Sequence, residues 1–264
     1  MNTKLPFLIT IILFLSFQCS IFSQRKRYKT FEQIDGFSIT PKLGLASMIG
    51  ELGEIGTMNP ILGIGVEKGI SEKFNIGFEI VGGNLSGSEN QIYNARFKTD
   101  FFQIQTLGIL NISQLLNDYK IHDFEIKAYS GGGLIWFHTD VYDFKSGKFL
   151  RTTADGTTQH TQLFQQAGAG IGEKGIFYTR ELVVPIGLFL DWRFGERLGI
   201  VANLGYNWVY NDKLDATNPY SLQNPNIIGG VNSYSETAND GWLNISLGLK
   251  YRFKSAKFKL QRGV

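Results

Sequence analysis

The chain has 264 residues, of which 14% are aromatic, 31 are glycine and 6 are proline. Its formal net charge of +3 is too small to favour nucleic-acid binding, and its length fits one domain. With 43% hydrophobic residues and a mean hydropathy of -0.07, the chain fits a soluble protein. It fits a transmembrane β-barrel equally well, because only half of each barrel strand faces lipid.

Residues 1–23 contain the three parts of a secretory signal peptide. These are a basic start at Lys4, an apolar run over 5–17 that is too short to span a membrane as a helix, and Ser23 at the expected cleavage position. We therefore expect an exported protein whose residues 24–35 form a polar lead-in in the periplasm.

Cys19 is the only cysteine, and it raises the alternative of a lipoprotein signal. Such a signal wants small residues directly before the cysteine, and Ser16-Phe17-Gln18 is a poor match. If Cys19 is removed with a signal peptide, the mature chain cannot form a disulfide. No other segment holds about 18 uninterrupted apolar residues, so we expect no transmembrane helix.

Beyond residue 35, apolar and polar residues alternate in run after run, which predicts strands that separate two different surroundings. The first run contains Pro41, which is tolerable only where its missing N–H is not needed. The expected strands cover residues 37–49, 60–70, 74–81, 96–112, 124–136, 182–194, 198–210 and 242–253.

The expected connections alternate between two lengths. They are short or moderate at 71–73, 113–122 and 195–197, and long at 50–58, 83–95, 139–177 and 211–240. An even number of strands, with short turns at one end and long loops at the other, is the layout of bacterial outer-membrane barrels. The pattern predicts an all-β fold, an eight-stranded antiparallel up-and-down transmembrane β-barrel.

Two of the strands are irregular. The apolar residues of the fourth strand change phase near Gly108, which predicts a bulge or an over-long strand end. The fifth strand passes three consecutive glycines and is expected to end near Trp136. In the loop that follows, Asp155-Gly156 lies between threonine-rich arms, which suggests a polar ribbon standing above the membrane.

The last run, WLNISLGLKYRF over 242–253, alternates without a break. At about 3.3 Å per residue and a tilt of about 40°, twelve residues can cross an apolar band about 25 Å tall. The run also resembles the terminal strand of outer-membrane barrels, in which a polar residue, a glycine and two aromatic or apolar positions form the signal read by the barrel-assembly machinery. The matching residues are Ser246, Gly248, Tyr251 and Phe253.

Three other stretches strengthen this resemblance: VVPIGLFLDWRF over 183–194, NDKLDA over 211–216, and Asn239-Asp240-Gly241. Over residues 36–253 the chain resembles the small outer-membrane β-barrel proteins typical of Bacteroidota, which are related in architecture to the OmpA barrel. The resemblance implies a location in the bacterial outer membrane. The peptidoglycan-binding domain that OmpA proteins carry after the barrel is expected to be missing, and a basic tail over 254–264 is expected to follow the last strand.

The volume of the side chains indicates which face of the strands points outward. An eight-stranded barrel is just wide enough for side chains to fill, so the large apolar side chains are expected outside and the glycine-rich polar face inside. A soluble, lipocalin-like barrel with the opposite orientation is the alternative. Aromatic residues are expected in two rims, with Phe37, Phe74, Phe124, Phe194, Tyr251 and Phe253 at the periplasmic rim and Trp136, Trp208, Tyr210 and Trp242 at the outer one.

Three acids and three bases fall on the polar face of six strands. They are Lys42, Glu67, Glu79, Lys127, Asp191 and Lys250. Isolated charges in a narrow lumen are costly, so we expect these six to pair as a charge layer in the periplasmic half of the interior. Paired in this way, they would leave no continuous water path.

No motif points to a catalytic residue, a cofactor or a metal. Gly170, Gly172 and Gly175 have a phosphate-loop spacing but lack the flanking strand and helix that such a loop needs. The three histidines have no metal-ligand spacing. His138 near the end of the fifth strand, with Ser86 or Ser88, keeps a lipid hydrolase or acyltransferase as an alternative.

We therefore expect a non-enzymatic outer-membrane barrel with a plugged lumen. Its long loops would carry interactions with outer-membrane lipid, ligands or partner proteins, and the barrel-assembly machinery would be its partner during insertion. A lipid-modifying enzyme is the first alternative and a small passive pore is the second. The sequence names no ligand.

Overall fold

The computed structural model describes residues 36–50, 52, 57–71, 73–91, 93–116, 123–153, 178–195, 197–210, 214–217 and 239–253. Among these residues, no helix is long and apolar enough to cross a membrane. The elements are β1 (Phe37–Ile49), β2 (Asn59–Gly69), β3 (Phe74–Glu89), β4 (Ala95–Asn111), α2 (Ile112–Leu116), β5 (Phe124–Asp143), β6 (Phe149–Thr152), β7 (Thr179–Arg193), β8 (Leu198–Val209) and β9 (Gly241–Arg252). The expected signal peptide, lead-in and basic tail lie outside the described residues.

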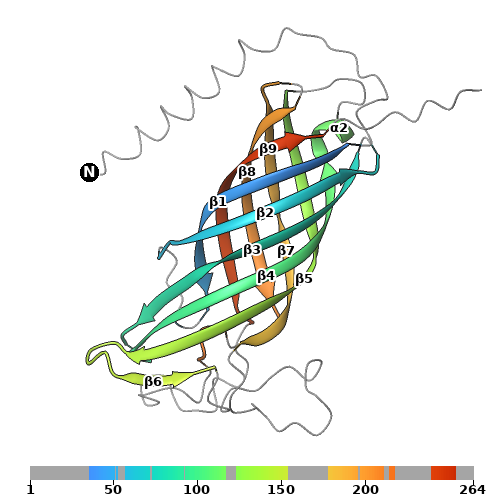
Figure 1. Ribbon diagram of the computed structural model, residues 1–264. Helices are drawn as coiled ribbons and strands as arrows, with labels where there is room; N and C mark the ends of the chain where they lie inside the picture. Colours follow the sequence, from blue (N-terminus) through green and yellow to red (C-terminus); the bar gives the residue numbers. More distant parts are fainter. Residues whose placement is uncertain are drawn as a thin grey trace, which may run out of the picture.

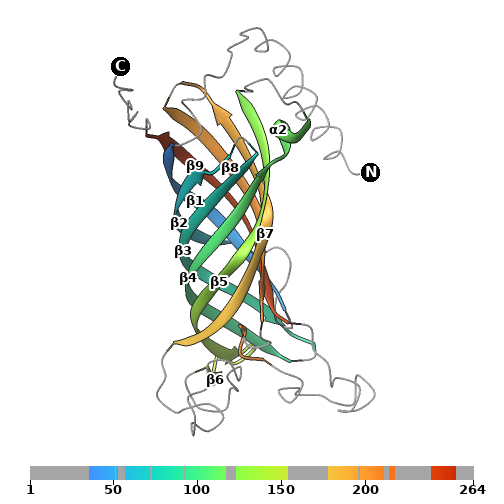
Figure 2. The same cartoon turned by 90° about the vertical axis from the view of Figure 1, so that its right-hand side faces the viewer.

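Eight of these strands form a closed ring (Figures 1 and 2). Each strand pairs with its neighbours in antiparallel fashion in the order β1, β2, β3, β4, β5, β7, β8, β9, and β9 pairs with β1 to close the ring. The short strand β6 pairs only with the far end of β5. The predicted eight-stranded antiparallel up-and-down barrel is therefore confirmed.

The two ends of the barrel differ. At the short-turn end, the connections β2–β3, β4–β5 and β7–β8 meet the start of β1 and the end of β9, and α2 lies beside them (Figure 1). At the loop-rich end, the longer connections emerge and β6 continues the wall (Figure 2). These two names are used below for the ends of the barrel.

Two prolines lie where a ladder is interrupted. The β1–β9 pairing omits Thr40 and Pro41, and the β5–β7 pairing omits Val184 and Pro185. Proline has no N–H to donate to a neighbouring strand. Because the ladder is already interrupted at both prolines, no ladder hydrogen bond is lost there. Pro41 is thus accommodated in the way its position in the first strand required.

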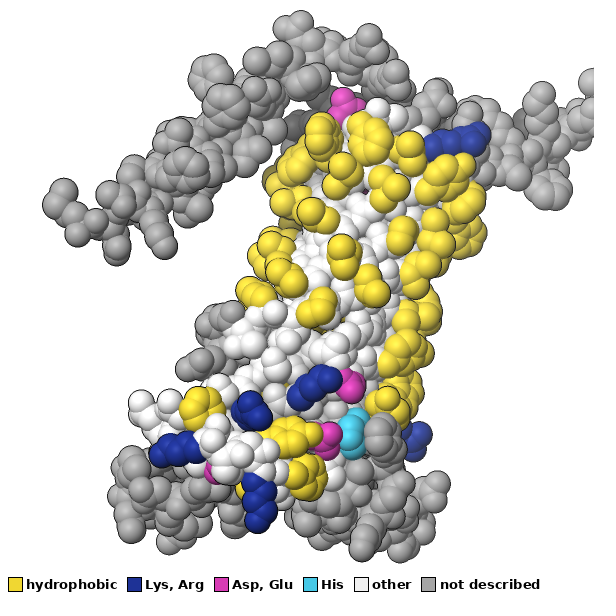
Figure 3. All heavy atoms as spheres, turned by 60° about the vertical axis from the view of Figure 1, so that its left-hand side comes forward, with side chains coloured by type: hydrophobic (Ala, Val, Ile, Leu, Met, Phe, Trp, Pro, Cys, Tyr) yellow, Lys and Arg dark blue, Asp and Glu magenta, His cyan; other side chains and the backbone are white. Residues whose placement is uncertain are grey.

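The outer wall is apolar over most of its length. Every barrel strand carries large, apolar, exposed side chains on its outward face, and Figure 3 shows such side chains covering the wall from the short-turn end toward the middle. Charged side chains gather on the wall toward the loop-rich end. The residues expected at the short-turn rim are exposed or half-buried on this outer face: Phe37, Phe74, Phe124, Phe194, Tyr251 and Phe253.

Of the two expectations for the fourth strand, a bulge or an over-long strand end, the bulge is wrong. β4 pairs with β3 and with β5 without a register shift, and its burial alternates from end to end. The apolar residues change phase because they change face: Leu107 and Ile109 point into the interior, while Phe102 and Leu110 point outward. A strand can keep a regular backbone while its two surroundings exchange polarity along its length.

Two strands run further than their sequences indicated. β3 continues through the expected glycine- and serine-rich loop to Glu89, and β5 continues past Trp136 to Asp143. The ribbon above the barrel is the β5–β6 hairpin, which turns over residues 144–148. Asp155-Gly156, where the turn was expected, lies outside the described residues. β4, with 17 residues, and β5, with 20, exceed the roughly 9–11 that a tilted strand needs to cross a membrane.

The prediction that Trp242 belongs to an outer aromatic rim is also wrong. Its side chain is fully buried inside the barrel and packs on Phe101 at a ring-centroid distance of 4.9 Å. Trp136, Trp208 and Tyr210 do point outward, and Trp136 pairs with Phe102. Trp242 follows the inward phase of β9, so alternation decides its face, and its proximity to a strand end does not.

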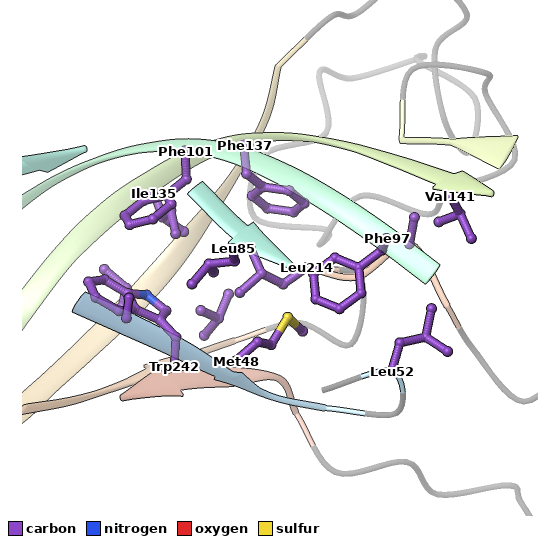
Figure 4. Close-up of a cluster of buried hydrophobic side chains, with 14 of the residues drawn as sticks. Met48, Leu52, Leu85, Phe97, Phe101, Ile135, Phe137, Val141, Leu214 and Trp242 are labelled. Carbon is purple, nitrogen blue, oxygen red and sulfur yellow. The ribbon is translucent and has the colours of Figure 1, made fainter. Parts of the chain in front are cut away.

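An apolar cluster fills the interior near the loop-rich end (Figure 4). Its largest members are Trp242, Phe97, Phe101, Phe137, Met48 and Leu85, from β1, β3, β4, β5 and β9. On the outer side of the same wall, β4 presents Arg96, Lys98 and Asp100. The polarity of the wall is therefore reversed here, with apolar residues inside and charged residues outside.

Candidate functional site

A ring of alternating charge crosses the interior near the short-turn end. Lys127 Nζ lies 3.1 Å from Glu67 Oε1 and 3.1 Å from Asp191 Oδ2. Lys250 Nζ lies 2.5 Å from Glu67 Oε2 and 2.9 Å from Asp191 Oδ2. Each lysine therefore bridges the same two carboxylates, and each carboxylate holds both lysines.

The ring spans the barrel because its members come from distant strands. Glu67 is on β2, Lys127 on β5, Asp191 on β7 and Lys250 on β9. In the ring of eight strands, β2 and β7 are four strands apart, so they face each other across the lumen. A contact that joins them has to pass through the centre of the cross-section.

Two further charged residues extend the ring. Arg252 Nη2 donates to Asp191 Oδ1 at 2.5 Å, and Glu125 Oε2 lies 3.6 Å from Lys127 Nζ. Both residues sit on the inward phase of their strands, where Glu125 alternates with Phe124 and Ile126. The alternation that selected the other charges could have selected these two as well.

Lys42 and Glu79 form a second pair next to the ring. Lys42 Nζ lies 2.6 Å from Glu79 Oε2, both side chains are buried, and the ammonium lies 4.9 Å from the centre of the Phe189 ring. A cavity of about 30 Å³, bordered by Lys42, Glu79, Glu67 and Lys250, separates this pair from the ring. It has room for one or two water molecules.

The expected charge layer thus occupies one region of the interior. Lys42, Glu67, Glu79, Lys127, Asp191 and Lys250 all take part in ion pairs there, as do Glu125 and Arg252. Among these eight residues, four carboxylates face four cations, and Arg193 on the inward phase of β7 adds a further cation beside them. Buried charges are tolerated when each has a partner of opposite sign, as here.

A layer of hydroxyl and amide groups follows toward the loop-rich end. The Tyr129 hydroxyl donates to Asn203 Oδ1 at 2.9 Å, and Asn203 Nδ2 donates to Asn244 Oδ1 at 3.0 Å. Gln103 Nε2 donates to Asn207 Oδ1 at 2.8 Å. The larger apolar cluster lies beyond this layer. A smaller apolar cluster packs beside the charges near the short-turn end, formed by Leu107, Ile109, Tyr129, Phe189 and Val201.

The residues that resemble an assembly signal split between the two faces. Ser246 and Gly248 point inward and are buried, whereas Phe253 is exposed and packs edge-on against Tyr251. A Cβ at Gly248 would lie 2.7 Å from Thr40 Cγ2 and 2.8 Å from the Pro41 carbonyl oxygen. The glycine is therefore needed for β1 and β9 to close the barrel, whatever its role as a signal.

The outer-wall residues of the enzyme alternative are not arranged as a nucleophile and its base. His138 Nε2 lies 3.4 Å from Asp140 Oδ1, and the Ser86 hydroxyl lies 2.9 Å from Asn59 Oδ1. Ser86 pairs with a residue of β4, and that strand separates it from β5 and His138. No group of three or more possible metal ligands occurs among the described residues.

Comparison with known proteins gives structural matches only. No family profile matches the chain, and no curated protein sequence matches it. The structure is similar to the attachment invasion locus protein Ail of Yersinia pestis, with a TM-score of 0.44 and 9% identity over 83% of this chain and 99% of that chain. It is also similar to Neisserial surface protein A, with a TM-score of 0.41 and 13% identity over 82% and 97% of the two chains.

A third similar structure is OprG of Pseudomonas aeruginosa, an outer membrane protein, with a TM-score of 0.38 and 12% identity over 85% of this chain and 98% of that chain. At these identities the similarity concerns the form of the barrel and not what each protein binds. The eight-stranded closed barrel itself stands on the strand pairing of this chain.

Proposed function

We propose that this protein is a non-enzymatic barrel of the bacterial outer membrane, closed to ions, whose loop-rich end faces outward and carries its interactions. The observation that carries this proposal is the ring of Glu67, Lys127, Asp191 and Lys250 across the lumen. Ionic groups that satisfy one another across a narrow lumen leave no room for a hydrated ion.

The outer wall supports the proposed membrane location. Apolar side chains point outward on all eight barrel strands, and a closed barrel leaves no unpaired edge in lipid. A soluble barrel would expose this apolar surface to water. Ordinary soluble proteins expose single apolar residues but not a contiguous apolar surface of this extent.

Conductance in planar bilayers tests the closed lumen. We expect no steady ohmic current from the wild-type barrel after its insertion has been verified by protease protection in the same lipid. Steady conductance that scales with the amount of inserted protein would contradict the proposal and favour a passive pore. The ion pairs sit in a region of low dielectric, so moderate salt is not expected to open the lumen.

Protease treatment of intact cells tests the orientation. The β5–β6 turn carries exposed Lys145 and Lys148, so trypsin added outside is expected to cleave there and to spare the barrel. Lys73 and Arg197 lie at the opposite end and are expected to stay intact. Cleavage confined to these two sites would reverse the orientation.

The interactions of the loop-rich end with lipid, ligand or partner protein belong to the same proposal. Mass analysis of outer-membrane lipid from a deletion strain separates it from a lipid-modifying enzyme, because an enzyme would leave its substrate lipid unmodified in that strain. An unchanged lipid profile is the expected result.

We also propose that the end of β9 is read by the assembly machinery. Phe253→Ala tests this better than a change at Gly248, which would also block closure of the barrel. The matched control is Phe37→Ala, because Phe37 and Phe253 are about equally exposed on the same rim. We expect less inserted barrel with Phe253→Ala and a normal amount with Phe37→Ala. An equal loss in both variants would mean that Phe253 acts only as an aromatic residue of the rim.

A further inference from the structure

Part of the connection between β8 and β9 lies inside the barrel at the loop-rich end. Residues 214–217 are buried, and Leu214 and Asp215 are fully buried. Figure 4 shows Leu214 among Leu85, Phe97 and Phe137, and its side chain belongs to the same apolar cluster. A stretch of connecting chain therefore contributes to the core that the barrel strands build.

Two threonines hold the main chain of this stretch. Thr99 and Thr139 are cross-strand partners on β4 and β5, and their hydroxyls lie 2.9 and 2.7 Å from the Leu214 carbonyl oxygen. Their inward neighbours on the two strands are Phe97, Phe101, Phe137 and Val141.

These threonines are buried polar residues among apolar neighbours. A buried hydroxyl is costly unless it has a hydrogen-bond partner, so a pair of threonines within an apolar wall needs an explanation. The two hydroxyls lie 2.8 Å from each other, and the Leu214 carbonyl oxygen accepts from both. The wall is thus shaped to receive this one peptide group.

Three other parts of the loop-rich end are tied to the same stretch. Leu52 N, after β1, donates to Asp215 Oδ2 at 2.9 Å, and Leu214 N donates to Asp240 Oδ2, just before β9, at 2.6 Å. From β6, Arg151 Nε donates to the Ala216 carbonyl oxygen at 2.6 Å and Nη2 donates to Thr217 Oγ1 at 2.7 Å.

We propose that residues 214–217 form a latch, an internal plug that closes the loop-rich end of the barrel and ties the chain after β1, the β5–β6 hairpin and the entry to β9 into one unit. When the latch is docked, these parts move together, and when it is released, they move independently. The latch lies at the loop-rich end and the charge layer near the short-turn end. The latch proposal therefore does not depend on whether the charge layer seals the lumen.

Trypsin cleavage after Lys213 measures release of the latch. The enzyme has to bind the residues that follow the cleaved bond, so residues 214–217 must leave the barrel before it can cut. The exposed Lys148 provides an internal reference for protease activity. In the purified full-length barrel, we expect cleavage after Lys148 to be much faster than cleavage after Lys213.

The variant Thr99→Val/Thr139→Val removes both hydroxyls and keeps the shape of the side chains. It is expected to speed cleavage after Lys213 by about tenfold or more, because two hydrogen bonds are lost and a buried carbonyl is left without a partner. Thr106→Val is the matched control, since Thr106 lies on the outward phase of β4 and is exposed. The gel-mobility difference between unheated and boiled samples reports whether each barrel has folded.

Hydrogen exchange provides a second, independent test. The amides of Leu52 and Leu214 are expected to be protected, and Asp215→Ala is expected to remove protection from both at once. Wild-type cleavage after Lys213 as fast as after Lys148, or exchange of both amides at the rate of an unstructured chain, would overturn the latch. Unchanged cleavage in a folded Thr99→Val/Thr139→Val barrel would do so as well.

Discussion

Near the short-turn end, the interior of the barrel holds four carboxylates and four cations, whereas near the loop-rich end it holds aromatic rings such as Trp242, Phe101 and Phe137. The outer wall changes in the opposite sense. It is apolar around the charges and carries Lys98 and Asp100 around the aromatic cluster.

In the proposed membrane location, the difference follows from the medium outside. Where the wall faces lipid, burying apolar side chains in the interior gains little, because the outside is as apolar as the inside. Complementary charges and hydrogen bonds then hold the strands in register. Where the wall faces water, apolar burial drives folding as it does in a soluble protein, and the interior becomes an apolar core. One continuous set of strands follows both rules.

Removing a central carboxylate is expected to have the largest effect. Asp191→Ala removes one of the two carboxylates that Lys127 and Lys250 share, together with the carboxylate that pairs with Arg252. Breaking a buried ionic network in this way costs about 3–5 kcal/mol. Urea unfolding of the barrel in lipid vesicles would measure the loss. Asp100→Ala, on the exposed outer face, is the control and should cost less than about 1 kcal/mol. Equal stability of the two variants would mean that the charge layer does not hold this end together.

A leucine truncation at each face sharpens the contrast. Leu85→Ala leaves a cavity in the apolar cluster and is expected to cost about 3 kcal/mol by the same unfolding measurement. Leu204→Ala, whose side chain is 57% exposed on the outer wall, leaves no cavity because lipid fills the space, so its cost should be smaller. A larger loss for Leu204→Ala would argue against a soluble-like core at the loop-rich end.

The smallest expected effect is a dependence of the latch on pH. Asp215 is surrounded by Leu52 N, the Thr217 N–H and Arg151. Its burial raises its pKa to about 6, although the two N–H donors and Arg151 act in the opposite direction. The docked latch therefore binds a proton more tightly than the released one. Docking is strongest in acid and weakens as the pH rises through about 6.

Between about pH 5 and about pH 7.5, the ratio of docked to released latch should fall about tenfold. Exchange of the Leu52 amide, corrected for the pH dependence of exchange in an unstructured peptide, measures this ratio. Asp215→Asn should abolish the dependence, because the side chain can no longer titrate. A latch that docks more firmly at the higher pH would contradict the sign of the shift.

Strand number, antiparallel order and the outward face were all accessible from the alternation of residues. A period of two is a local property, and an even number of such runs with short and long connections in turn leaves one simple closed arrangement. The inward phase also places Lys127 or Lys250 on the lumen side of its own strand. It does not determine which carboxylate each lysine meets, because that depends on strand stagger across the barrel.

The sequence by itself determined a barrel of eight strands and which residues of each strand share a face. Only the tertiary structure decided how far β3 and β5 continue, because Gly82, Ser86 and Asp140 are paired there by neighbouring strands against their own propensity. Trp242 and Leu214 became core residues for the same reason. A side chain at a strand end or in a connection is buried only if strands distant in the sequence pack over it. The local residue pattern does not show whether they do.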